Sequence, residues 1–181
     1  MRITWYPTLR TLITTFAVMS FVGLAAAESV VVVPESSRLA LASYDGESRD
    51  ASFKGTERIS GRFAIAWRNE NDEGLLEIRF APDGASRRRL PSDPGQSDMA
   101  ITVTNRDAAV LRLVGRETAA RILEGELVAI EGTATLVIGD VETGIDDGAR
   151  WWQAAILSVE RAKVEREWAA VDGDDDGDDG C

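Results

Sequence analysis

No histidine occurs in the sequence, and its one cysteine, Cys181, is the last residue. The absence of histidine excludes histidine-based catalytic triads, histidine general bases and every zinc site that needs an imidazole ligand. A single cysteine excludes disulfide bonds within the chain and metal sites made of cysteine alone. We therefore expect a domain that is stabilised by packing alone.

Basic residues are scarce relative to acidic ones, with 20 Lys and Arg against 31 Asp and Glu and a formal net charge of −11. An acidic surface repels phosphate backbones, so we expect no nucleic acid among the partners. Part of this charge is concentrated at the end of the chain, where six aspartates stand in the last ten residues: Asp172, Asp174, Asp175, Asp176, Asp178 and Asp179. Their mutual repulsion predicts a disordered acidic tail over 172–181.

Long apolar runs are also few. One run, 12–27, follows Arg2 and Arg10 and ends in three alanines, which is typical of a secretory signal peptide cleaved after Ala27. The run is shorter than the roughly 20 apolar residues of a membrane span, so we expect no integral membrane segment after cleavage. The sequence thus predicts a periplasmic or secreted protein with a signal peptide (1–27), one β-rich domain (28–171) and the tail. In an oxidising compartment, Cys181 at the tip of the tail predicts a disulfide-linked dimer.

The clearest structural pattern lies between residues 58 and 81. Apolar residues alternate with polar ones on both sides of a polar run at 69–74, which has the period of two of a half-buried strand. The apolar positions are Ile59, Phe63, Ile65 and Trp67 before that run, and Leu76, Ile78 and Phe80 after it. This pattern predicts an antiparallel hairpin with one face in solvent. The preceding segment, 45–55, is polar and predicts a loop.

Further elements are expected on both sides of the hairpin. They are an edge strand at 39–44, a long surface loop at 82–98, strands at 99–103, 127–130, 133–141 and 151–159, and a short helix at 105–114. Thr104 and Asp107 have the spacing of a capping box, and Gly115 is suited to the left-handed position that ends a helix. A buried strand at 105–114 is the alternative, and 160–171 suits either a strand or a helix.

Strand, strand, strand, short helix, strand, strand is the element order of an OB-type barrel. We therefore predict a mainly β protein with a small antiparallel, OB-like barrel, and keep a β-sandwich as the alternative. Such folds bind many different ligands or none, so the fold by itself does not give the function.

An acidic segment precedes two tryptophans. Asp140, Glu142, Asp146 and Asp147 supply the oxygen ligands that calcium prefers, although their spacing matches no defined calcium loop. Together with Trp151 and Trp152 they also suggest a glycosidase, in which paired carboxylates flank a sugar stacked on an aromatic ring. Neighbouring strand residues face opposite ways, so we expect one of the two tryptophans in the core and the other on the surface.

One basic cluster, Arg87, Arg88 and Arg89, falls in the predicted loop at 82–98. Guanidinium groups there are expected to be exposed and suit an anionic partner. No nucleophile motif such as Gly-x-Ser-x-Gly is present. The sequence therefore predicts an exported, non-enzymatic binding or accessory module for an unknown envelope protein or glycan, with no cofactor unless calcium binds. The alternative is a carboxylate-dependent hydrolase that acts on cell-envelope glycans.

Overall fold

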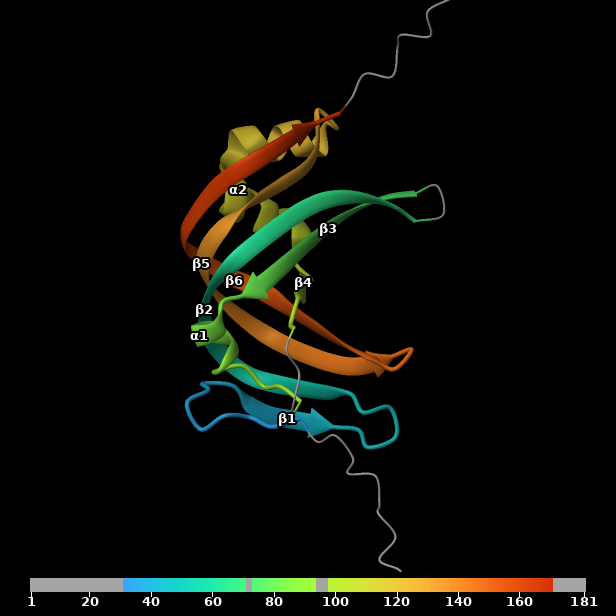
Figure 1. The fold of residues 1–181 in the computed structure, drawn as a ribbon, viewed down its shortest axis with the longest axis vertical. Helices are drawn as coiled ribbons and strands as arrows, with labels where there is room; N and C mark the ends of the chain where they lie inside the picture. Colours follow the sequence, from blue (N-terminus) through green and yellow to red (C-terminus); the bar gives the residue numbers. More distant parts are fainter. Residues whose placement is uncertain (1–30, 71–72, 94–97, 171–181) are drawn as a thin grey trace, which may run out of the picture.

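The computed structural model describes residues 31–70, 73–93 and 98–170. The chain is mainly β (Figure 1), and its elements are β1 (Ala40–Tyr44), β2 (Ala51–Glu70), β3 (Glu73–Pro82), α1 (Gly84–Arg87), β4 (Ile101–Val103), α2 (Arg106–Leu123), β5 (Leu127–Asp146) and β6 (Ala149–Ala169). The predicted signal peptide (1–27) and acidic tail (172–181) lie outside the described residues.

The predicted hairpin is present as β2 and β3. Phe63 pairs with Phe80 and Ile65 with Ile78 in an antiparallel register, and all four side chains are buried. β2 begins earlier than expected, at Ala51, so the predicted loop at 45–55 is too long. Ala51 and Phe53 are buried, and β2 pairs there with both β1 and β5, which explains why the chain is already a strand at this point.

The six strands form one mixed sheet in the order β1-β2-β3-β4-β6-β5, and β2 also pairs with β5. Four of the neighbouring pairs and the β2–β5 pair are antiparallel, but β4 and β6 are parallel, with Thr102 opposite Gln153. The prediction of a wholly antiparallel arrangement was therefore wrong. α2 connects β4 to β5, which runs opposite to β4. β6 is antiparallel to β5 and therefore runs in the same direction as β4.

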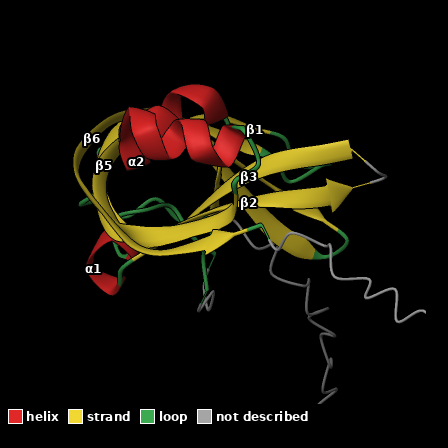
Figure 2. Cartoon of the chain, turned by 90° about the horizontal axis from the view of Figure 1, so that it is seen from above, coloured by secondary structure: helices red, strands yellow, loops and turns green. Residues whose placement is uncertain are grey.

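The helix predicted at 105–114 is confirmed as the first part of α2. Gly115 has the expected left-handed φ of 77°, and its non-helical backbone (ψ 170°) ends this first segment; after the kink a second helical segment reaches Leu123. The predicted capping box is absent, because the N-cap residue Asn105 makes no side-chain cap bond and its amide instead bonds the backbone of Ile156. In Figure 2, α2 lies over the curved strands β5 and β6.

β5 and β6 form a long hairpin that includes the segment predicted as an acidic loop. The two strands meet at a two-residue turn, Asp147 and Gly148, whose φ angles are both positive, at 48° and 78°. This is the geometry of a tight hairpin turn that favours Asp-Gly. The open question at 160–171 is answered in favour of a strand up to Ala169.

The core lies between the curved sheet and α2. Buried residues from α2 (Val110, Leu113 and Ile122) join those of the strands in one apolar cluster. Gly132 permits a close approach in this region, because a Cβ atom there would lie 2.6 Å from Cζ of Phe63 and would also meet the backbone oxygen of Lys163.

Candidate functional site

The predicted basic cluster is divided by the fold. The expected loop contains the short helix α1, which ends with Arg87 and is followed by Arg88 and Arg89. Arg88 is exposed, but Arg87 and Arg89 are half-buried, so the expectation of three exposed side chains was wrong. Arg89 lies 3.6 Å from the buried carboxylate of Glu57 and donates a 2.6 Å hydrogen bond to the carbonyl of Arg58. Arg89 thus ties α1 to β2.

Arg87 and Arg88 line a small hollow of about 380 Å³ together with Gly84, Ser92 and Met99. Close to Ser92 in the chain, Asp93 forms a salt bridge with Arg150, whose side chain is only 4% exposed. The basic side chains of this region are therefore partly used in holding the loop to the sheet.

The two tryptophans separate as predicted. Trp152 is buried and its ring stacks against Phe53, with ring centres 6.5 Å apart and an interplanar angle of 27°. Trp151 is half-buried on the opposite face, where its ring lies close to Gly144 and to the carboxylate of Asp50. An aromatic side chain packed across from a strand glycine restores contacts that the glycine lacks, which gives Trp151 a structural role.

The four predicted metal-ligating carboxylates do not come together. Asp140, Glu142, Asp146 and Asp147 are all exposed, and Glu142 accepts a 2.6 Å hydrogen bond from Gln153. Within residues 31–70, 73–93 and 98–170, no group of three or more Asp, Glu, His or Cys residues is placed to hold a metal ion. The carboxylates splay into solvent because the predicted loop is in fact the end of a β-hairpin.

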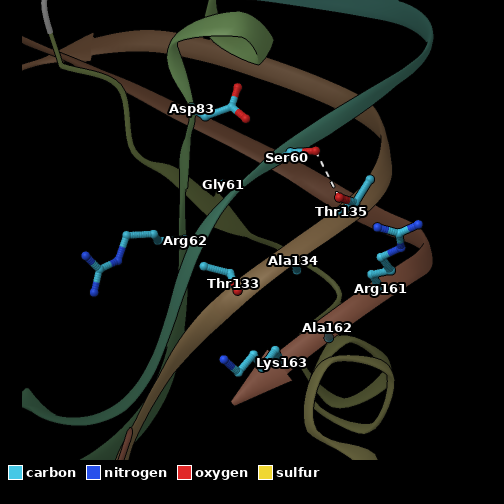
Figure 3. A pocket seen from close by; sticks show the side chains of 10 residues that line it. All are labelled: Ser60, Gly61, Arg62, Asp83, Thr133, Ala134, Thr135, Arg161, Ala162 and Lys163. Atoms are coloured by element: carbon cyan, nitrogen blue, oxygen red, sulfur yellow. Dashed lines mark hydrogen bonds between the residues drawn. The ribbon is translucent and has the colours of Figure 1, made fainter. Parts of the chain in front are cut away.

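Sequence reasoning missed a hollow of about 550 Å³ on the outer face of β2, β5 and β6 (Figure 3). Its lining residues are Ser60, Gly61, Arg62, Asp83, Thr133, Ala134, Thr135, Arg161, Ala162 and Lys163. A signal was present in the sequence, since the polar residues that alternate with the buried ones in all three strands include hydroxyl and cationic side chains. The pairing of distant strands was needed to bring them together.

Strand register arranges the lining in cross-strand rows. One row is Ser60–Thr135–Arg161, and a second, two residues away, is Arg62–Thr133–Lys163. The intervening row, Gly61–Ala134–Ala162, also lines the hollow and forms its floor between the two outer rows. Each outer row thus places a threonine hydroxyl on β5 beside a cation on β6. In Figure 3, Arg62 and Arg161 lie on opposite sides of the hollow.

Two contacts fix the upper end of the hollow. The backbone N–H of Ser60 donates to Oγ of the buried Ser86, at 2.8 Å, and the hydroxyls of Ser60 and Thr135 share a 2.9 Å hydrogen bond. Asp83 caps α1 by accepting a 2.7 Å bond from the N–H of Ser86. This backbone bond is the main cause of a lowered pKa of the Asp83 carboxyl.

The charges around the hollow are unevenly matched. Arg62 lies 3.8 Å from Glu131, but in the described part of the chain neither Arg161 nor Lys163 forms a salt bridge. Glu160, next to Arg161 in the chain, is held by Arg58, and the Arg58 hydrogen bond is the main cause of the lowered pKa of Glu160. The charge of Arg161 is a further, smaller cause of this lowered pKa. Arg161 and Lys163 are thus exposed cations with no salt bridge among the described residues that a ligand would have to break.

Among the described residues, no helix has the length and apolar character needed to cross a membrane. Comparisons of the chain with protein-family models, with curated proteins and with solved structures find no match.

Proposed function

We propose that this protein is an exported, OB-like binding or accessory module that holds a component of the cell envelope in the hollow on β2, β5 and β6. The observation that carries the proposal is the convergence on one open surface of three hydroxyls and of two cations that form no salt bridge within the described residues. Small specific sites combine such polar groups with space for a ligand. The export step rests on the sequence of residues 1–27.

Strand pairing supports the OB-like part of the proposal. Five strands are linked in a circuit, β2–β3, β3–β4, β4–β6, β6–β5 and β5–β2, and α2 stands between β4 and β5 in the chain. An OB-fold is a five-stranded Greek-key barrel that binds oligosaccharides or oligonucleotides on the face of its second and third strands. Those strands correspond here to β3 and β4.

The β3–β4 face is less suited to a ligand in this chain, because the charged groups of β3 are already paired. Glu77 of β3 is half-buried and contacts both Arg68 of β2, at 2.5 Å, and Arg79 of β3, at 2.9 Å. A ligand would have to break these ion pairs. In the hollow on β2, β5 and β6, a ligand could bind Arg161 and Lys163 without breaking an ion pair of either side chain. This difference favours the hollow as the ligand surface.

A carboxylate-dependent hydrolase of envelope glycans is the competing proposal. It would need two carboxylates on either side of a glycosidic bond, at a separation of about 5 to 10 Å. Among the described residues, Asp83 is the one carboxylate that lines the hollow, and it caps α1. A binding module therefore accounts for the lining of the hollow better than a hydrolase does. Release of reducing sugar from envelope glycans by the purified protein would favour the hydrolase.

The test of the binding site uses a steric block. Thr135→Trp places a large side chain in the hollow, while Thr102→Trp makes the same change at a half-buried outward position of β4. Envelope extract is passed over each immobilised protein, and the retained material is compared with that of the wild-type protein. We expect Thr135→Trp to abolish retention and Thr102→Trp to preserve it. The reverse result would place the ligand on the β3–β4 face.

A further inference from the structure

Resting on the proposed function, we infer that the ligand of the hollow is a short acidic glycan that carries at least two anionic groups, one for Arg161 and one for Lys163. The shared chemistry is a carboxylate or phosphate group on a sugar.

The spacing of the two cations comes from the strand itself. Arg161 and Lys163 are alternate residues of β6, both exposed and both on the outer side, so their Cα atoms are about 6.6 Å apart. A ligand with a single anionic group could engage both only if the two side chains converged on that one group. A ligand with two such groups engages both without bending the strand.

Each cation has a hydroxyl next to it. Thr135 is opposite Arg161 and Thr133 is opposite Lys163, on the neighbouring strand about 4.8 Å away. A guanidinium group binds a carboxylate or phosphate through two parallel hydrogen bonds, and an ammonium group binds it as a point charge. The threonine hydroxyls can then bind the sugar hydroxyls that surround each anionic group. Alternating hydroxyl and cation positions match an acidic sugar better than a neutral one.

The surroundings limit the length of the ligand. Glu131, Glu160 and Glu165 are exposed or half-buried on β5 and β6 close to the two rows, and the chain as a whole is acidic. A long polyanion would bring uncompensated charges against these carboxylates, and this repulsion acts within a Debye length of about 10 Å. Binding is thus restricted to short ligands, which also agrees with the expected lack of nucleic acid binding.

Calorimetry with defined probes tests the inference. Galacturonic acid, its dimer and its trimer supply one, two and three carboxylates, neutral galactose oligomers supply none, and inorganic phosphate and glucose 1-phosphate provide the phosphate arm. We expect the dimer and trimer to bind more tightly than the monomer, and the neutral oligomers not to bind at millimolar concentration. If the phosphate probes bind more tightly than monomeric galacturonic acid, the anionic group of the ligand is a phosphate. If galacturonic acid binds more tightly, it is a carboxylate.

Matched charge variants locate the contacts. Arg161→Gln and Lys163→Gln should each weaken dimer binding about tenfold, the lower end of the range for a hydrogen bond to a charged group, because both side chains are exposed. Arg116→Gln removes the same charge from an exposed position on α2 and should leave the affinity unchanged. Equal weakening by all three variants would indicate non-specific charge attraction and would overturn the inference.

Two failures can be told apart. Neutral oligomers that bind as tightly as acidic ones, with binding lost in Thr135→Trp, would refute the acidic ligand and leave the proposed site intact. If acidic oligomers bind both Thr135→Trp and Arg161→Gln as tightly as they bind the wild-type protein, the site itself is refuted. Absence of binding to every acidic probe at millimolar concentration would also overturn the inference.

Discussion

The indole N–H of Trp67, near the end of β2, donates a 2.8 Å hydrogen bond to the carbonyl oxygen of Ile122 in the last turn of α2. This bond joins the tip of the first hairpin to the end of a helix across 55 residues of the chain. At its other end α2 is held by Asn105, whose side-chain amide both donates to the carbonyl and accepts from the N–H of Ile156 on β6. Side chains outside the helix thus fix both ends of α2 against the sheet.

Replacing Trp67 with phenylalanine tests the first of these anchors. Trp67→Phe keeps an aromatic ring but removes the donor, and leaves the carbonyl of Ile122 with backbone N–H donors alone, from Glu124 and, at 3.3 Å, from Gly125. The free energy of unfolding should fall by about 0.5 to 1.5 kcal/mol in urea titrations. Trp168→Phe is the control, because Trp168 is 39% exposed and should change stability by less than about 0.5 kcal/mol. Equal losses in both variants would show that the hydrogen bond is not the cause.

A glycine-to-alanine pair tests the close packing of β5 on the core. The added Cβ of Gly132→Ala would overlap the ring of Phe63 and the backbone of Lys163, so strands have to move apart. We expect a loss of about 1 to 3 kcal/mol, as for other overpacked core sites. In Gly84→Ala the nearest atom is the flexible Nη1 of Arg88 at 3.8 Å, and stability should be retained. Thermal unfolding followed by circular dichroism distinguishes the two, and an unaffected Gly132→Ala protein would contradict this packing.

Local patterns were sufficient to predict the β2–β3 hairpin, because side-chain alternation depends only on neighbouring residues. The opposite faces of Trp151 and Trp152 followed from the same rule. The parallel pairing of β4 with β6 could not be derived in this way, since it depends on which distant edges meet. The hollow was missed for the same reason: Ser60, Thr135 and Arg161 are far apart in the chain and become one row only through the strand register.

Local signals also failed where a side chain had two possible partners. Thr104 and Asp107 have capping-box spacing, but Asn105 takes the N-cap position and its amide binds β6 instead. Arg87, Arg88 and Arg89 read as a uniform basic cluster, yet Arg89 faces the buried carboxylate of Glu57. A sequence shows the donors and acceptors of such side chains, whereas the tertiary contacts decide which of them pair.

The single cysteine, together with the proposed export, leads to a prediction about covalent dimers. Cys181 lies outside the described residues, and in an oxidising compartment it has no second cysteine in its own chain with which to pair. Protein recovered from the periplasm should therefore show a dimer band on non-reducing gels that disappears with reductant, and Cys181→Ser should be monomeric on the same gels. The circular dichroism of the two forms should be identical, because the last described strand ends at Ala169, before Cys181 in the sequence. Finding only monomer in the oxidised wild-type protein would contradict the prediction.

Removing the cap of α1 should change the response of stability to acid. Asp83→Ala loses the bond to the N–H of Ser86 and should lower the free energy of unfolding by about 1 kcal/mol at pH 7. That bond lowers the pKa of Asp83 in the folded state, so its contribution is complete above the unfolded value near pH 4 and is lost as the pH falls through the folded value. The difference in the free energy of unfolding between the wild-type protein and Asp83→Ala should thus be largest above about pH 5 and shrink towards about pH 3. Urea titrations across this pH range measure the difference. Glu35→Ala, at an exposed position, is the control, and its free energy of unfolding should lie within about 0.5 kcal/mol of that of the wild-type protein at pH 7. A difference that stays constant down to about pH 3 would mean that the ionised carboxylate is not what stabilises α1.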